Sequence, residues 1–344
     1  MRKIILLFLL SVLFISCKKT NTTPTKPTSI RISADKIGVF SNGQDVITFE
    51  AKLPDNTTIS KDVEFFVDGE IISGNTYTSN IAGEYSVYAM FENIKSPTLK
   101  FGVVEKVESP GSYSTKVLVE DFTGAWCGWC PRLSYKLEEA VIANPNIIPV
   151  AVHYNDAMSY TFVNELMNNY NITIFPSGLL NRSTLWNEKQ IALDNLLGKL
   201  SRIGLGISSI RNGQKLDVNV KVGFTISTKT KLKLVVYLLE NGIIKDQENY
   251  LNDVPGGGWY QAGDVIKDFE HNYVLRSALT NIFGDDIPQY VTLERNTYST
   301  NFSIDISNYN TSKLSLVAFV LSDVSGTDVY NVQWAKAGTT VDFD

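Results

Sequence analysis

Apolar and polar positions follow three patterns along the chain of 344 residues. In residues 29–105 and again in residues 204–344, short apolar segments alternate with turn residues, which is typical of β-sandwiches. Residues 114–203 combine continuous apolar strands with apolar residues at helical spacing, which predicts a mostly parallel sheet covered by helices on both faces. The pattern therefore predicts a multidomain protein of the α/β plus all-β class, with a linker at about residues 106–114.

The N-terminal residues form a separate signal. Residues 1–16 are basic and then apolar, which is typical of a secretory signal peptide and too short to span a membrane. Ser16-Cys17 resembles the end of a bacterial lipobox, which implies that Cys17 is acylated and anchors the chain to a membrane. The alternative is an ordinary signal peptide in which Cys17 has no role. Residues 17–28 are rich in Thr, Asn, Pro and Lys and predict a flexible tether.

Residues 29–105 contain short β segments separated by strong turn signals such as Asp68-Gly69. The run from Ala82 to Val87 resembles the sixth-strand signature of immunoglobulin-like bacterial surface modules. The resemblance implies an immunoglobulin-like β-sandwich, and since the segment contains no cysteine, its apolar core alone must hold it. We expect this part to act as a spacer between the membrane and the next domain.

Two of the three cysteines, Cys127 and Cys130, lie in the middle of the chain with two residues between them. Thiols at this spacing can close a disulfide, supply half of a metal site or have no chemical role. A structural zinc ion needs four ligands, but there is no second cysteine pair, and the only histidines, His153 and His271, lie far apart in sequence. A redox dithiol is therefore favoured, and we expect neither a metal nor a cofactor.

The residues around this pair predict a strand, a turn and a helix. Residues 117–122 are mostly apolar, and apolar residues recur at three- and four-residue spacing from Leu133 to about Ala143. Cys127 would then lie at a helix N-terminus, where free N–H groups and the helix dipole stabilise a thiolate. Because the thiolate is the form that attacks a disulfide, Cys127 is the expected nucleophile and Cys130 the more shielded, resolving thiol.

Residues 117–130 resemble the strand, turn and Trp-Cys-Gly-X-Cys motif of thioredoxin, and Phe175-Pro176 resembles the cis-proline that faces the dithiol in that family. The resemblance implies that residues 114–203 form a thioredoxin-like α/β domain in which Asp121 exchanges protons with Cys130. The alternative is that Asp121 is an ordinary strand-end residue and that Glu120 faces inward. The implied catalytic residues are Cys127, Cys130 and Asp121, with a Cys127–Cys130 disulfide, and the implied substrate-binding residues are Trp126, Trp129, Phe175 and Pro176. Trp129 replaces the family's usual proline or histidine, so the direction of electron flow stays open.

Residues 204–344 form a β-rich C-terminal domain. The predicted strands are 216–222, 232–238, 302–306 and 314–320. A long insertion rich in Gly, Asp and aromatic residues lies among them, and such loops often carry function. A centre built on Asp268, Glu270 and His271 matches no ligand motif, so we expect this insertion to shape a partner surface.

Three further polar residues are expected to have no chemical role. His153 could approach Cys127, but a solvated histidine at the end of a strand is the simpler expectation. Asp156 and Arg182 are expected at the surface.

The order of segments is similar to that of the bacterial lipoproteins related to outer membrane protein twenty-eight (Omp28), which carry a lipobox, a thioredoxin-like domain and a β-rich C-terminal domain. Residues 120–131, 175–176 and 271–276 carry this resemblance. It implies an outer membrane lipoprotein of the cell envelope, either periplasmic or surface-exposed. The net charge of −5 is not basic enough to predict binding of nucleic acid.

Together these features predict a membrane-anchored thiol–disulfide oxidoreductase that acts on thiols or disulfides of envelope proteins. The alternative is a cell-surface binding or adhesion lipoprotein that uses the thioredoxin-like fold as a redox-inert scaffold. A thiol of low pKa that is reversibly reduced in the folded chain would favour the enzyme.

Overall fold

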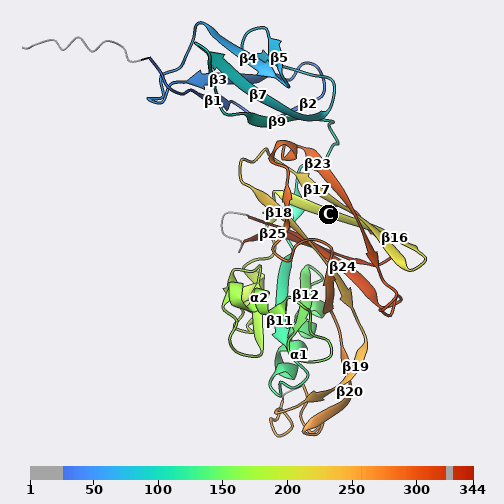
Figure 1. Ribbon diagram of the computed structural model, residues 1–344. Coiled ribbons are helices and arrows are strands. Elements are labelled where there is room, and N and C mark those ends of the chain that lie inside the picture. Colours follow the sequence, from blue (N-terminus) through green and yellow to red (C-terminus); the bar gives the residue numbers. More distant parts are fainter. Residues whose placement is uncertain (1–25, 257, 323–327) are drawn as a thin grey trace, which may run out of the picture.

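The computed structural model describes residues 26–256, 258–322 and 328–344 (Figure 1). The predicted signal peptide, the predicted lipidation site Cys17 and most of the predicted tether lie outside the described residues. Figure 1 shows a β-sandwich at the N-terminal end and a larger body in which short helices lie beside long strands. In the described part of the chain, no helix is both long and apolar enough to cross a membrane.

The N-terminal sandwich has two sheets that enclose one apolar core. One sheet has the order β1-β3-β6, and the other has the order β2-β9-β7-β4-β5 with β8 paired to β7. The strands are β1 (Arg31–Ala34), β2 (Gly38–Phe40), β3 (Ile47–Lys52), β4 (Val63–Val67), β5 (Glu70–Ile72), β6 (Thr76–Tyr77), β7 (Gly83–Phe91), β8 (Ile94–Lys95) and β9 (Leu99–Val104). Phe49, Phe65 and Phe101 pack together in the core. The predicted immunoglobulin-like sandwich is confirmed, and buried aromatic rings stabilise it in a segment without cysteine.

A tyrosine of the larger body docks onto this sandwich. The 3-10 helix η1 (Gln289–Val291) places Tyr290 against Gly38 of β2 and Gly102 of β9. A Cβ atom at Gly102 would lie 2.1 Å from Cδ2 of the tyrosine ring, and one at Gly38 would lie 2.2 Å from the tyrosine carbonyl oxygen. Both positions therefore require glycine for this close approach.

A mixed sheet of nine strands forms the centre of the larger body. Its order is β14-β13-β11-β12-β21-β18-β24-β25, and β22 pairs with β18 beside this path. The strand β11 pairs in parallel with β12, which pairs in parallel with β21, whereas β18 and β24 are antiparallel. The strands are β11 (Val117–Thr123), β12 (Ile147–His153), β13 (Ser177–Leu180), β14 (Thr184–Leu185), β18 (Leu232–Glu240), β21 (Val274–Ala278), β22 (Asp285–Ile287), β24 (Leu314–Ser322) and β25 (Val329–Lys336).

The predicted fold class is wrong, because residues 114–203 do not form a separate thioredoxin-like α/β domain. Strands account for 46% of the structure and helices for 10%, so the protein is mostly β. The helices are α1 (Cys130–Ala143), α2 (Val163–Tyr170) and α3 (Gln190–Asp194). The edge of β12 pairs with β21, a strand from the C-terminal region, and the sheet continues into β18 and β24. The pattern of apolar residues predicts a strand but not the distant edge with which that strand pairs, and here the pairing joins both regions in one sheet.

A second sheet, of order β23-β17-β16-β26, packs on the C-terminal half of the nine-stranded sheet through a shared apolar core. Its strands are β16 (Ile203–Asn212), β17 (Lys215–Phe224), β23 (Asn296–Asp305) and β26 (Thr340–Val341). The four predicted C-terminal strands are confirmed as β17, β18, β23 and β24. Two small two-stranded sheets complete the body, formed by β10 (Tyr113–Ser114) with β15 (Leu200–Ser201) and by β19 (Ile243–Glu248) with β20 (Val265–His271).

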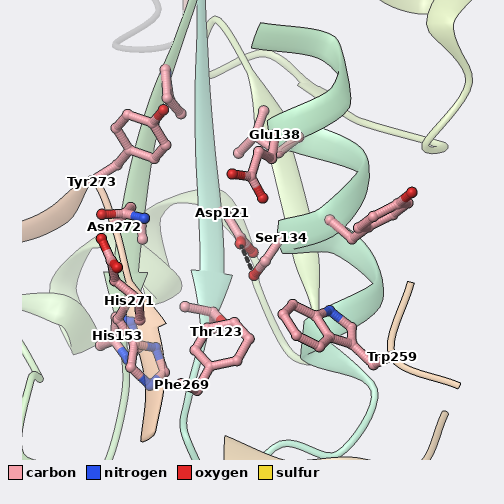
Figure 2. A pocket seen from close by; sticks show the side chains of 15 residues that line it. Asp121, Thr123, Ser134, Glu138, His153, Trp259, Phe269, His271, Asn272 and Tyr273 are labelled. Carbon is pink, nitrogen blue, oxygen red and sulfur yellow. Dashed lines mark hydrogen bonds between the residues drawn. The ribbon is translucent and has the colours of Figure 1, made fainter. Parts of the chain in front are cut away.

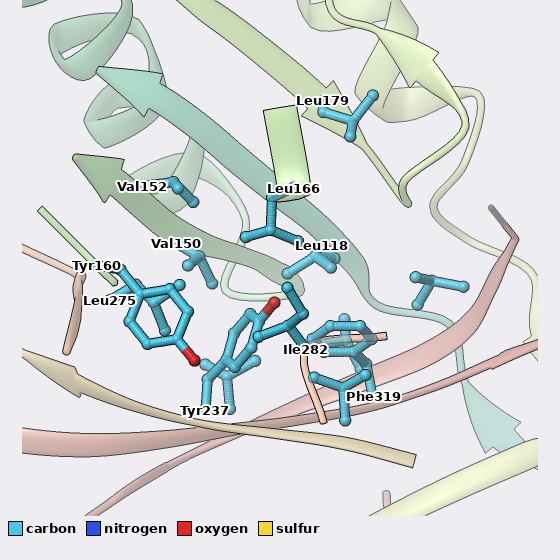
Figure 3. Packing of buried hydrophobic residues seen from close by; sticks show 14 of the residues in the cluster. Leu118, Val150, Val152, Tyr160, Leu166, Leu179, Tyr237, Leu275, Ile282 and Phe319 are labelled. Atoms are coloured by element: carbon cyan, nitrogen blue, oxygen red, sulfur yellow. The ribbon is translucent and has the colours of Figure 1, made fainter. Parts of the chain in front are cut away.

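One apolar core joins the region before residue 203 to the region after it (Figure 3). Leu118 of β11 and Leu166 of α2 belong to the same buried cluster as Tyr237 of β18 and Phe319 of β24. All seven residues of β11 are buried, since this core covers one face of the strand and α1 covers the other. Successive side chains of β11 therefore enter two different environments.

Candidate functional site

The two central cysteines lie in the turn between β11 and α1 and form a disulfide. Cys130 is the first residue of α1, so Cys127 lies three residues before the helix begins. The exposed fraction is 5% for Cys127 and 1% for Cys130. The peptide bond between Phe175 and Pro176 is cis. The predicted disulfide and cis bond are both present, whereas the catalytic and substrate-binding roles of these residues stay predictions.

Aromatic side chains gather on the outside of this turn. Trp126, Trp129 and Tyr250 are 42%, 45% and 58% exposed. The rings of Trp126 and Phe175 lie 5.4 Å apart, and Tyr154 stacks on Phe175 at 5.5 Å. On the other side of the turn, Trp129 contacts Tyr250 edge-on at 5.8 Å. We call these five residues the aromatic surface; exposed apolar groups of this kind are typical of interaction sites.

Backbone hydrogen bonds attach a segment of the C-terminal insertion to the same turn. The N–H of Glu248 donates to the carbonyl of Ala125 at 2.9 Å, and the N–H of Tyr250 donates to the carbonyl of Gly128 at 2.8 Å. The ring of Tyr250 lies on Gly128, where an added Cβ would be 2.4 Å from ring carbon Cδ1. The segment thus follows the turn closely and leaves no room for a side chain at Gly128.

Two side chains of the insertion strengthen this attachment. The buried amide of Gln247 donates to the carbonyl of Cys127 at 3.0 Å and to that of Gly124 at 3.3 Å. The indole N–H of Trp259 donates to the carbonyl of Pro131 at 3.2 Å. We call Gln247–Tyr250 and Trp259 the clamp. Because the clamp uses the carbonyl groups on both sides of Cys127, another polypeptide cannot bind to them while it is in place.

No signal in the sequence could have linked the clamp to the cysteines. Gln247 is an ordinary polar residue of a β segment, more than one hundred residues from Cys127. The Gly-rich insertion indicated only a loop that could shape a partner surface. Its contact with the turn results from the pairing of β21 with β12, which brings the insertion to this end of the sheet.

Asp121 faces α1 and lines a cavity of about 60 Å³ (Figure 2). The hydroxyl of Ser134 lies 3.5 Å from Oδ2 of Asp121 and 3.4 Å from the carbonyl of Cys130. The second oxygen, Oδ1, is buried without a hydrogen-bond partner. Burial raises the pKa of Asp121 to about 7, and the Ser134 hydroxyl offsets only part of this effect. Ser134 therefore links Asp121 to the backbone of Cys130, and proton exchange between Asp121 and Cys130 stays a prediction.

Glu120 is also buried, on the opposite face of β11. Its carboxylate pairs with Arg182, whose Nε lies 3.1 Å from Oε2, and both side chains are fully buried. Arg182 also donates to the hydroxyl of Tyr237 and to the carbonyl of Ile282. Burial opposes the charge of Arg182, but the Glu120 carboxylate raises the arginine pKa above its usual value. The expectation that Arg182 lies at the surface is wrong: its guanidinium is buried, pairs with Glu120 of β11 and reaches the C-terminal region through Tyr237 and Ile282.

The two histidines of the chain come together although they are distant in sequence. Their ring centroids are 5.1 Å apart, and 2% of His153 and 4% of His271 are exposed. Nδ1 of His153 bonds Oδ2 of Asp156 at 2.7 Å, and that oxygen also accepts from the N–H of Ala125. Burial lowers the pKa of His271 to about 4, and the neighbouring His153 adds to this effect. The expectations of a solvated His153 and a surface Asp156 are therefore wrong.

Comparisons with known proteins support the fold and indicate a family. A family model described as outer membrane protein Omp28 matches residues 163–341. No curated protein matches the chain. Among solved structures, HBP35 of Porphyromonas gingivalis matches with a TM-score of 0.53 and 18% identity, over 66% of this chain and 77% of that chain. This likeness concerns the fold alone.

Two further structures resemble the chain only weakly. The adhesin InvE of Yersinia pseudotuberculosis matches with a TM-score of 0.23 and 10% identity, over 92% of this chain and 58% of that one. A DUF3823 family protein from Bacteroides ovatus matches with a TM-score of 0.23 and 11% identity, over 85% of this chain and 96% of that one. TM-scores this low support no conclusion about structure or function.

Proposed function

Because the chain belongs to the Omp28 family of outer membrane proteins, we propose that it is a binding protein in which the Cys127–Cys130 disulfide is a permanent part of the scaffold. Family membership places it in the cell envelope at the outer membrane. In the proposal, an acylated Cys17 holds the chain at the membrane, and the immunoglobulin-like sandwich separates the larger body from the lipid. The partner is an envelope or external protein that presents apolar side chains to the aromatic surface.

The observation that carries this proposal is the clamp over the disulfide. A thiol–disulfide exchange requires an attacking sulfur to approach one sulfur of the pair. Here 5% of Cys127 and 1% of Cys130 are exposed, and the clamp holds the backbone carbonyls on both sides of Cys127. Enclosure of this kind protects a disulfide from reduction while it leaves the surrounding indole rings exposed.

The exposed rings favour binding over a purely structural role. Trp126 and Trp129 flank the disulfide and keep 42% and 45% of their surface in water. Burying a side chain of this size against a partner contributes about 1.5–3 kcal/mol. The disulfide, the clamp and α1 hold these rings in place, so little conformational entropy is lost when a partner binds.

A thiol–disulfide oxidoreductase of envelope proteins is the second candidate. The observation that favours it is Asp121, which Ser134 links to the backbone of Cys130. The pKa of Asp121 is about 7, a value suited to proton transfer at neutral pH. This reading requires the clamp to open so that Cys127 can be reached. In it, Trp126, Trp129, Phe175 and Pro176 would contact the substrate.

One redox titration separates the two candidates. The folded full chain is equilibrated with reduced and oxidised dithiothreitol in graded ratios, alkylated and analysed by mass spectrometry. We expect the disulfide to stay closed until guanidinium unfolds the chain. As a matched control, the Gln247→Ala/Tyr250→Ala variant should open the clamp and make the disulfide reducible in the folded state. Reversible reduction of the folded wild-type chain near about −270 mV, the potential of thioredoxin, would instead support the oxidoreductase.

The binding role has its own test in intact cells. A photo-crosslinking residue replaces Tyr250 in the clamp, and in a control variant it replaces Ile210, which is 73% exposed on β16. We expect a protein adduct from position 250 and none from position 210. The adduct should persist in a Cys127→Ala/Cys130→Ala background. A partner adduct that forms without light, requires the cysteines and is released by a thiol would be a mixed disulfide and would contradict the binding role.

A further inference from the structure

His153 and His271 come from different halves of the larger body and meet in its interior. His153 ends β12 and His271 ends β20, and a ring centroid separation of 5.1 Å places the two side chains in direct contact. Both are more than nine-tenths buried. Since the chain has only these two histidines, their meeting in the interior needs a physical reason.

Each ring already has a partner for one nitrogen. His153 uses Nδ1 for Asp156 at 2.7 Å, and the ring of His271 donates a hydrogen bond to the backbone carbonyl of Lys245. Nε2 of His271 is buried without any hydrogen-bond partner. A metal-ligating histidine is typically held through one ring nitrogen by a carboxylate or a backbone carbonyl, while its other nitrogen faces the ion. Both rings have the supporting group, and His271 also has the unpartnered nitrogen.

The histidines lie at one end of the cavity that Asp121 lines (Figure 2). The cavity of about 60 Å³ exceeds the roughly 10–15 Å³ that one water molecule needs. Oδ1 of Asp121 is the second buried polar atom on this cavity without a partner. Glu138 and Glu270 also belong to its lining. Three carboxyl groups around one cavity favour a cation over an anion.

We infer that Nε2 of His153 and Nε2 of His271 bind a divalent transition-metal ion such as Zn²⁺, with water completing its shell. Imidazole nitrogen suits zinc, copper and nickel, whereas calcium and magnesium take oxygen ligands. In the described part of the chain, no three His, Cys, Asp or Glu side chains are grouped closely enough to hold an ion by themselves. Water in the cavity therefore supplies the remaining ligands and links the ion to Oδ1 of Asp121. This site is independent of the proposed binding function.

Histidine-selective labelling tests the site in the unmodified chain. Because the protein has two histidines, ¹⁵N-histidine labelling gives an NMR spectrum of only two rings, provided that the purification tag contains none. Zn²⁺ is titrated into the full chain in detergent. We expect the Nε2 resonances of both rings to shift together and to saturate at one ion per chain. If neither resonance moves, or if only one does, the inference is wrong.

Variants assign the binding to these atoms. His271→Gln should abolish the stoichiometric Zn²⁺ uptake measured by equilibrium dialysis, and Asp156→Asn, which removes only a supporting group, should weaken it by about 10- to 100-fold. Asp217→Asn is the matched control, since it removes a carboxylate on the exposed face of β17 and leaves the cavity and both imidazoles unchanged. A circular dichroism spectrum shows whether each variant is folded. Uptake that is unchanged in a folded His271→Gln variant would overturn the assignment.

Discussion

Replacing Asp121 by asparagine tests the electrostatics of the buried cavity. The carboxyl has a pKa of about 7 in the folded chain against 3.8 for the free side chain, a difference of about three units. At about 1.36 kcal/mol per unit, the ionised carboxylate costs the folded state roughly 4 kcal/mol. Because the folded pKa lies above the unfolded one, the folded state binds the proton more tightly. Wild-type stability therefore falls as pH rises from about 4 to about 7.

Asparagine has nearly the same shape and does not titrate. We expect Asp121→Asn to match the wild-type free energy of unfolding near pH 4 and to exceed it by up to roughly 4 kcal/mol at pH 8. The assay is urea unfolding at half-unit pH steps, followed by tryptophan fluorescence with the disulfide intact and a chelator present. Asp217→Asn, on the exposed face of β17, is the matched control and should show no such trend. A stability difference that is independent of pH would refute the reasoning.

Three further predictions concern packing. Arg182→Leu should lower the free energy of unfolding by about 3–5 kcal/mol, because it leaves the Glu120 carboxylate buried and unpaired. Adding Glu120→Leu should recover much of this loss. Equal urea midpoints for the single and double variants would contradict this prediction. Gly128→Ala should displace Tyr250 of the clamp, whose ring would lie 2.4 Å from the new methyl group. Dithiothreitol should then reduce the disulfide of the folded chain faster. An unchanged rate would show that the clamp does not protect the disulfide. Gly102→Ala should expel Tyr290 from the N-terminal sandwich, since the Cβ would lie 2.1 Å from the ring. Small-angle scattering should then show a more extended molecule. An unchanged scattering profile would contradict the docking of Tyr290 on the sandwich.

The sequence by itself determined the features that depend on near neighbours. The apolar runs of β11, β17, β18 and β24 reflect burial on one or both faces, so their periodicity predicts the strands correctly. The spacing of the two cysteines allows a disulfide, and their position before an amphipathic segment predicts the turn before α1. Resemblance to known motifs added the cis bond before Pro176 and the family.

Tertiary structure alone decided which of these elements meet. No local pattern indicates that β12 pairs with β21, and this pairing makes residues 114–203 part of a mostly β body. The same pairing brings Gln247 onto the backbone of Cys127 and His271 onto His153. Arg182 is a further case. Its charge alone predicted a surface position, but in the folded chain the Glu120 carboxylate of β11 pairs with it in the interior. Contacts across such distances depend on how whole sheets pack, because the free energy of each contact is gained only once both chain segments are held in place.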